Sequence, residues 1–391
     1  MDIRKATGLP GVAAALFTSL FLPLPSQAAD IKENLSVRGF YTLDITHSDS
    51  DGAVLPALSD PPPQPNEGDT SIDGSILGLQ VDYALSDNLG LTLQAVSSRL
   101  ADGSYTPTLD WAYLNYDFGN NLHLRGGKMK LSILQGTELR YVGFSRLWVR
   151  PLVPTSGAGG FDDYAGAELV KGASVGSYNL RFQAAYGKAD HQKDFVDNRD
   201  VKLLSGRIER NESWVNLALL HARYKAGRPR GDTISDNAEL LMGAVEAEVP
   251  LGNAVINAGY AYGKSDVNPD ERLGYLSLGY RIDRFTPYLL LTEHQMIFDA
   301  SPWAALSPPP PGAPPPPPGA PFPPPGMSQP PPLDGARKTN IVALGFRYDL
   351  GTTYAVKVQW DHWKSNDRSN QVRGTVARDG NLLTFAIEGT F

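Results

Sequence analysis

Residues 381–391 read NLLTFAIEGTF, and this stretch alternates in polarity along its whole length. One face would carry Leu383, Phe385, Ile387, Gly389 and Phe391, and the other would carry Thr384, Ala386, Glu388 and Thr390. A period of two residues indicates a β-strand, and this pattern suits a wall with oil outside and water inside. A soluble antiparallel sheet can alternate in the same way. We predict that this stretch closes a transmembrane β-barrel and that Glu388 faces water.

The same period predicts further strands upstream. We expect them at 35–46, 72–85, 89–98, 109–118, 122–130, 164–172, 177–187, 199–210, 213–224, 237–249, 254–264, 271–282, 285–294, 340–349 and 354–363, which makes sixteen with the last. The strand at 213–224 is apolar on both faces, so its register stays open. Short connections such as 119–121 and 211–212 alternate with longer ones. This order is typical of an outer-membrane barrel with its turns in the periplasm, whereas a soluble sandwich or propeller does not require it.

The amino-terminal segment has the features of a secretory signal. A basic start precedes an apolar run from Val12 to Leu24 and a small-residue exit at Ala28-Ala29. This run is shorter than the roughly 20 residues that a membrane-spanning helix needs. We predict a cleaved signal over 1–29 and a single all-β barrel domain over 30–391, located in the cell outer membrane.

The composition and the motifs of the chain exclude several kinds of site. The chain has no Cys, so neither a disulfide framework nor a thiolate metal site is possible. The formal net charge of −7 argues against nucleic acid as a partner. The segment from Gly259 to Ser265 ends in Gly-Lys-Ser, but it has too few residues for a phosphate-binding loop. We expect no catalytic residue, no cofactor and no metal.

A proline-rich connection precedes the last three predicted strands. It covers residues 295–339, and sixteen of the chain's 32 prolines lie between Pro308 and Pro332. Proline has no N–H for a sheet ladder, so this run should be extended polyproline or irregular chain. The parity of the strands places the connection outside the cell. A solvated flap, a steric shield and an adhesive tether all suit this composition.

Three short stretches carry a family resemblance. They are Leu124-Arg125-Gly126-Gly127-Lys128 before a long third loop, Gly345-Phe346-Arg347-Tyr348-Asp349 before a short turn, and the terminal Phe391. With sixteen predicted strands, the chain resembles a Gram-negative outer-membrane porin. The resemblance implies a homotrimer in outer-membrane lipid and lipopolysaccharide and a third loop folded into each channel. It also implies that the barrel assembly machinery reads Phe391 as a signal.

The third loop, 131–163, should form the pore constriction. Its acidic residues are Glu138, Asp162 and Asp163, and its basic residues are Arg140, Arg146 and Arg150. The apolar centre Leu147-Trp148-Val149 should pack against the inside wall. Family porins place a basic wall opposite loop carboxylates, so the three loop arginines depart from that pattern and leave the ion preference open. The predicted wall residues are Arg38, Arg125, Arg347 and Lys357, of which Arg347, Lys357 and Arg38 could form one basic strip after closure.

These observations favour a passive diffusion channel for small hydrophilic solutes and ions. Opposite charges on loop and wall would orient polar solutes and set the selectivity of the pore. A lumen that is merely hydrated and held by ion pairs is the alternative for any single charge. Two other functions stay open, namely a barrel that presents the proline-rich connection as an adhesin or shield, and an outer-membrane hydrolase.

Overall fold

The computed structural model describes most of the chain after the predicted signal. The described residues are 29–32, 34–49, 70–100, 103–152, 163–189, 196–227, 233–267, 270–298, 335–365 and 379–391. The predicted signal before residue 29, Asp162 and the proline-rich run from Pro308 to Pro332 lie outside these residues. No helix among the described residues is long and apolar enough to cross a membrane.

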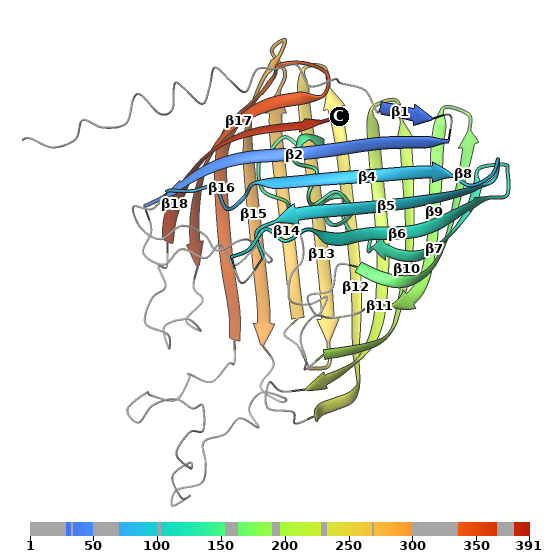
Figure 1. The fold of residues 1–391 in the computed structure, drawn as a ribbon. Coiled ribbons are helices and arrows are strands. Elements are labelled where there is room, and N and C mark those ends of the chain that lie inside the picture. The colour runs from blue at the N-terminus through green and yellow to red at the C-terminus, as the bar shows by residue number, and fades with distance from the viewer. Residues whose placement is uncertain are drawn as a thin grey trace, which may run out of the picture.

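Sixteen antiparallel strands form a closed ring (Figure 1). Each strand pairs with the next one in the chain, and β18 pairs with β2 to complete the ring. The ring strands are β2 (Leu35–Ser48), β4 (Ile76–Ala84), β5 (Leu89–Ser98), β6 (Thr108–Asp117), β7 (Leu122–Lys130), β8 (Asp163–Val175), β9 (Tyr178–Lys188), β10 (Val196–Arg210), β11 (Ser213–Gly227), β12 (Thr233–Leu251), β13 (Ala254–Ser265), β14 (Asp270–Tyr280), β15 (Phe285–Phe298), β16 (Gly335–Asp349), β17 (Tyr354–Ser365) and β18 (Asp379–Thr390). The predicted barrel of sixteen strands is confirmed.

Two short strands lie beside the ring, and the sequence pattern did not predict either. Strand β3 (Thr70–Ser71) pairs with the end of β2. Strand β1 (Ala29–Lys32) pairs with residues 35–37 of β2, just beyond the part that β18 covers. Figure 1 shows β1 and the marked carboxyl end of the chain near the same rim of the ring. Strand β1 therefore pairs with the part of the β2 edge that β18 leaves free.

The seam between β18 and β2 is closed by backbone bonds and by two interlocking rings. The backbone of Phe391 exchanges hydrogen bonds of 2.7 and 2.9 Å with Gly39. The Phe391 ring occupies the place that a Cβ of Gly39 would take, and the Tyr41 ring occupies the place that a Cβ of Gly389 would take. A glycine leaves a slot in which an aromatic ring can cover the backbone of the next strand. Both glycines are therefore needed for the rings to lie flat across the seam.

The outer surface of the ring is apolar. Alternate residues point away from the interior and stay exposed, as Leu43 and Ile45 do on β2. Other exposed apolar side chains are Leu77, Leu79, Leu93, Leu109, Leu114, Leu169, Leu204, Leu217, Leu219, Leu241, Leu344 and Leu383. Soluble monomers rarely expose a continuous apolar surface of this kind. The exterior instead suits contact with the hydrocarbon of a bilayer.

Short turns join the strands at one end of the barrel, which we call the turn end. Asn120, Asn121, Asn211 and Asp283 adopt left-handed backbone conformations there, with φ between 51° and 57°. Asparagine and aspartate tolerate this region better than other residues with a side chain. The short connections predicted around these residues are confirmed, because β6 and β7, β10 and β11, and β14 and β15 meet across them.

One predicted strand begins later than its sequence pattern indicates. The stretch 72–85 was expected to be continuous, but β4 begins at Ile76. The chain turns before it, since the N–H of Ser75 donates to the carbonyl oxygen of Ile72 at 3.0 Å. The carboxylate of Asp44 on β2 occupies the space above Gly74. This neighbour belongs to another strand, so the local pattern could not reveal the turn.

Candidate functional site: the third loop and the barrel interior

The third loop begins against one side of the barrel interior. Leu131, Ile133 and Leu134 are almost fully buried in an apolar cluster with the inward faces of β9 to β14. The wall residues of this cluster include Val201, Leu203, Leu220, Tyr224, Leu240, Met242 and Leu273. This side of the inner wall is therefore packed against the loop and not hydrated. Apolar wall residues replace a hydrated surface because the loop packs against them.

A single helical turn follows this apolar contact. Helix α2 (Gln135–Glu138) is preceded by two backbone N–H groups, those of Ile133 and Leu134, that donate to the Thr137 hydroxyl at 3.1 and 3.3 Å. The hydroxyl in turn donates to the Leu134 carbonyl oxygen at 2.7 Å. The carboxylate of Glu138 accepts a hydrogen bond from Ser132 at 2.9 Å. The Thr137 hydroxyl thus supplies hydrogen-bond partners for backbone N–H and C=O groups that no neighbouring strand can pair with.

The middle of the loop is held by Lys357 of β17. Its ammonium group donates hydrogen bonds to three loop carbonyl oxygens, those of Gly143 (2.9 Å), Arg146 (2.7 Å) and Trp148 (3.2 Å). Lys357 also forms an ion pair of 2.5 Å with Glu388 of β18, and both side chains are 0% exposed. Glu388 was expected to face water. It does point inward, but the loop seals it from solvent, because a Cβ on Gly143 would overlap its carboxylate.

A second ionic contact holds the next turn of the loop. The guanidinium of Arg150 pairs with Asp361 of β17 at 2.5 Å and donates to the Thr384 hydroxyl of β18 at 2.5 Å. The N–H of Val149 donates to the side-chain oxygen of Gln359 at 2.8 Å. Charged hydrogen bonds of this kind are stronger and more directional than neutral ones. They place the loop backbone at a defined height on β17 and β18.

Two further arginines serve the loop backbone. Arg347 of β16 donates to the carbonyl oxygens of Phe144 (2.7 Å) and Arg146 (3.2 Å). The Arg146 guanidinium turns back into the loop and donates to the carbonyl oxygens of Val149 (2.9 Å) and Arg140 (3.2 Å). Both guanidinium groups therefore donate hydrogen bonds to carbonyl oxygens of the loop backbone. The loop passes from the apolar wall at β9–β14 to the charged wall at β16–β18, and so crosses the interior.

A cavity of about 360 Å³ lies on one side of the loop, facing β2 to β6. It brings together Arg38 and Glu138, with Gln80, Gln94, Asp110, Trp111 and Tyr141 among its other lining residues. Arg38 is 56% exposed and pairs with Asp82 at 2.6 Å. This side therefore combines one accessible cation with one loop carboxylate.

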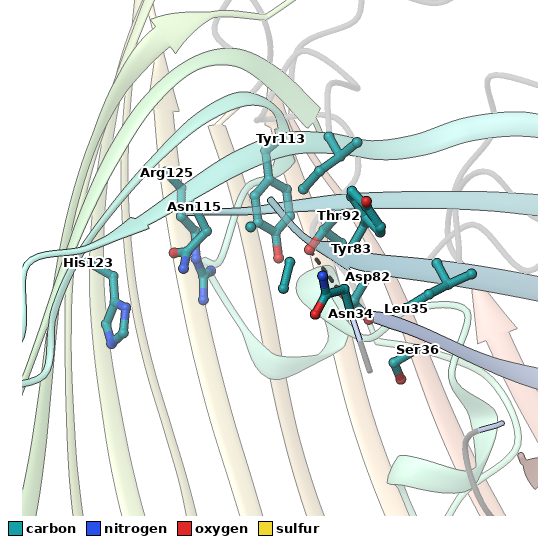
Figure 2. A pocket seen from close by; sticks show the side chains of 13 residues that line it. Asn34, Leu35, Ser36, Asp82, Tyr83, Thr92, Tyr113, Asn115, His123 and Arg125 are labelled. Carbon is teal, nitrogen blue, oxygen red and sulfur yellow. Dashed lines mark hydrogen bonds between the residues drawn. The ribbon is translucent and has the colours of Figure 1, made fainter. Parts of the chain in front are cut away.

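A second cavity, of about 460 Å³, opens near the turn end of β2 to β7. Figure 2 shows Arg125 next to Asn115 and the ring of Tyr113 on the wall, with Asp82 and Thr92 joined by a hydrogen bond of 2.7 Å. Arg125 pairs with Glu168 at 3.1 Å and lies over the Tyr113 ring. Several polar side chains line this cavity, as a water-filled entrance requires, namely Asn34, Ser36, Asp82, Thr92, Asn115, His123 and Arg125.

A third cavity, of about 380 Å³, lies on the other side of the loop, facing β12 to β16. Trp148 of the loop and Tyr275 of β14 meet edge to face, with ring centroids 5.5 Å apart. Glu246 and Glu248 of β12 line the same cavity. The Tyr275 hydroxyl donates to the Glu246 carboxylate. The third loop thus separates two cavities that both contain charged side chains.

The structure brings some of the predicted pore residues together and leaves others apart. Arg347 and Lys357 are directly opposite each other on β16 and β17. Arg38 does not join them, because it lies on β2 beyond the end of β18 and pairs with Asp82. Asp163 is the first residue of β8 and pairs with Lys128 of β7 at 3.0 Å. Asp162 lies outside the described residues.

The sequence reasoning missed Tyr275 and its glycine partner. The Tyr275 ring occupies the place that a Cβ of Gly259 would take, and from this position it reaches Glu246 across β13. The Gly259–Ser265 stretch therefore belongs to strand β13 and forms a slot for a ring. A Tyr on one strand and a Gly on the next leave no local signal, because their pairing depends on register.

A Gly-x-Ser-x-Gly pattern occurs at Gly172–Gly176, where hydrolases can carry a nucleophile. In this chain the pattern forms the hairpin between β8 and β9, and the Ser174 hydroxyl donates to Asn179 at 2.9 Å. A nucleophile elbow joins a strand to a helix, and strand β9 follows here instead.

Comparison with solved structures shows outer-membrane barrels. The OmpF structure of Salmonella typhi, a complex with daunomycin, aligns with a TM-score of 0.56 and 11% identity over 92% of this chain and 98% of that one. An anion-selective porin from Comamonas acidovorans aligns with a TM-score of 0.55 and 13% identity over 91% and 99%. The trimer form of OmpT, an outer membrane protein of Vibrio cholerae, aligns with a TM-score of 0.52 and 16% identity over 92% and 100%.

Sequence comparisons add nothing to this likeness. No protein-family model matches the chain, and no curated protein sequence matches it. At identities between 11% and 16% the structural likeness concerns the fold. The chain therefore has the fold of the Gram-negative outer-membrane porins.

Proposed function

We propose that the protein is a passive diffusion channel for small hydrophilic solutes and ions. The observation that carries the proposal is the third loop, which crosses the interior and leaves on each side a cavity whose lining includes charged side chains. The cavities measure about 380 and 360 Å³, which suits single small solutes. Solutes would pass without chemical change, so the proposal includes no catalytic residue.

The polar residues of the interior divide into two roles in this proposal. Arg38 and Glu138 contact the passing solute, because they line a cavity from the wall and from the loop. Arg125 lines the entrance near the turn end. Residues that hold the loop in place form the second group, which comprises Arg146, Arg150, Arg347 and Lys357. Arg140 takes part through its carbonyl oxygen, which accepts from Arg146. Asp163 begins β8 next to the end of the loop and pairs with Lys128, and Asp162 would add a negative charge beside it.

The location that we propose is the outer membrane, in contact with lipid and lipopolysaccharide. Export would use the predicted signal over 1–29. The trimer proposal rests on a difference between two outer faces of the ring. Outward positions of β2, β4, β5 and β6 carry no Asp, Glu, Lys or Arg, whereas those of β9, β10 and β11 carry Lys188, Lys202 and Arg223. The uncharged face can pack against a second copy without burying a charge.

Phe391 would act in assembly. Its ring and backbone both bind Gly39 at the seam, so its removal should impair closure of the ring and recognition by the assembly machinery more than it alters the pore. Comparing folded barrel in the outer membrane for wild type and a chain lacking Phe391 tests this. Equal amounts of folded barrel would contradict the assembly role.

Reconstitution tests the channel itself. Liposomes that contain the protein should swell in small neutral sugars, and planar bilayers should show step conductances grouped in threes. A barrel that gives neither swelling nor conductance would overturn the proposal. Swelling with single, ungrouped conductance steps would keep the channel and reject the trimer.

A further inference from the structure

The cavity between the third loop and strands β12 to β16 has a chemistry that the proposed channel does not require. Its lining contains four carboxylates and three guanidinium groups, which are Glu246, Glu248, Asp283 and Asp349, and Arg146, Arg281 and Arg347. Most channel linings need water and balanced charge. This cavity also contains a buried aromatic pair and an unsatisfied donor, both described below.

Two of the three guanidinium groups are already engaged. Arg347 binds Asp349 at 2.8 Å and two loop carbonyl oxygens, and it is only 13% exposed. Arg146 donates to loop carbonyls. Arg281 remains, half-exposed and 3.4 Å from Glu212. Against this one cation stand the half-buried Glu248 and the exposed Asp283, so the accessible charge of the cavity is negative.

The aromatic pair is built into the wall. Tyr275 lies flat in the slot that Gly259 provides, and its hydroxyl donates a hydrogen bond to Glu246. Trp148 approaches Tyr275 edge to face at 5.5 Å. Both aromatic side chains are more than nine-tenths buried, and so is Glu246. Aromatic rings beside carboxylates attract a cation and provide an apolar surface for the carbon atoms next to it.

Trp148 also supplies an unsatisfied donor. It lines the cavity, it is 7% exposed, and its indole N–H has no hydrogen-bond partner among the described residues. A buried N–H without an acceptor is costly. A hydroxyl oxygen would satisfy it, whereas an ammonium group cannot accept a hydrogen bond.

We propose that this cavity is a binding subsite for organic cations that also carry hydroxyl groups, of which amino sugars are the simplest class. The ammonium group would bind between Glu246 and Glu248, the sugar face would lie against Trp148 and Tyr275, and a sugar hydroxyl would accept from the indole N–H. This inference rests on the proposed channel function, because the solute has to enter the barrel.

Three matched sugars test the subsite. D-Glucosamine, D-glucose and D-glucuronate share a ring and differ in charge, and at about pH 6 the amine is protonated. Block of the ion current in planar bilayers gives an apparent affinity for each sugar. We expect glucosamine to bind about tenfold more tightly than glucose, since a charged hydrogen bond exceeds a neutral one by that factor. Glucuronate should bind least.

Single-residue variants separate the contribution of the carboxylates from that of Trp148. Glu248→Gln and Glu246→Gln should each reduce the preference for glucosamine over glucose. Trp148→Phe should weaken the binding of both sugars by the same factor. Glu209→Gln is the matched control, because Glu209 is a carboxylate of β10 that pairs with Arg207 and does not line the cavity. It should keep the wild-type preference. Electrophoretic mobility of the folded barrel confirms that each variant has folded.

The outcomes distinguish this inference from the channel proposal. A wild-type barrel that conducts and is blocked equally by glucosamine and glucose overturns the inference alone. Loss of the preference in Glu209→Gln, with retention in both Glu248→Gln and Glu246→Gln, also overturns it. A wild-type barrel that admits neither ions nor sugars overturns the channel proposal and the inference with it.

Discussion

The two attachments of the third loop differ in the contacts that they add to apolar packing. The first, at 131–134, packs apolar side chains against the wall of β9 to β14. The second, at 143–150, packs Trp148 into an apolar cluster with β14 to β18. It adds the ion pairs of Lys357 with Glu388 and of Arg150 with Asp361, and both cations bind further oxygen atoms. Both attachments are buried, but only the second fixes individual atoms.

The apolar attachment keeps the loop inside the barrel, whereas the charged attachment sets its position. Apolar packing is non-directional, so the first attachment keeps the loop inside without defining its exact height. Charged hydrogen bonds have preferred lengths and angles, so the second attachment sets where the loop backbone and Trp148 stand. We therefore expect damage at the charged attachment to be larger and to affect the pore more.

The largest effect should come from Lys357→Met. Glu388 would remain fully buried without its cation, and removal of one partner of a buried ion pair typically costs about 3–5 kcal/mol of the free energy of unfolding. Thermal denaturation in detergent, followed by the mobility of folded and unfolded barrel, measures the loss. Noise in the open-channel current should rise, because the loop carbonyls lose their common donor.

A double variant sharpens this result. Lys357→Met combined with Glu388→Leu removes the stranded charge, so it should recover much of the stability that the single variant loses. Equal stability of the single and double variants would show that the ion pair does not hold the loop.

At the apolar attachment, Leu134→Ala should cost about 2–4 kcal/mol, since it leaves a cavity in a packed cluster. Reversal potentials should stay at their wild-type values, because no charge moves. Leu134→Met conserves volume and serves as the control, with a cost below about 1.5 kcal/mol. A changed ion selectivity in Leu134→Ala would mean that apolar packing also positions the loop.

Thr137→Val should have a smaller effect at the same attachment. It removes the acceptor of the Ile133 and Leu134 N–H groups and should cost about 1 kcal/mol. Thr137→Ser keeps the hydroxyl and should be close to wild type. The same thermal denaturation compares them, and identical curves for the valine and serine variants would exclude a role for this hydroxyl.

Arg38→Gln should have the least effect on stability. Arg38 is more exposed than buried, so solvent screens its pair with Asp82, and the loss should stay within about 0–1 kcal/mol. The ion preference should nevertheless shift toward cations, which a reversal potential in a KCl gradient measures. Asp82→Asn should shift it in the opposite direction. An unchanged reversal potential in both variants would remove this side of the loop from the conduction path.

The sixteen ring strands, the alternation of short and long connections and the even strand number could be predicted from the order of residues along the chain. These features depend on neighbours in the chain: a strand with lipid on one face must alternate every second residue, as 381–391 does, and tight turns need residues such as Asn120 and Asn121. The residue types that face inward followed from the same period. Local physical chemistry is sufficient for each of these predictions.

Which side chains contact one another could not be predicted from the sequence, because it depends on strand register and loop packing. Strand β11 is apolar on both faces, and its inward face became that of Trp214 and Leu220 through pairing with β10 and β12. The burial of Glu388 required the third loop to cover it and Lys357 to lie beside it. Register and loop packing arise from contacts between distant segments. Periodicity along a single strand contains no information about those contacts.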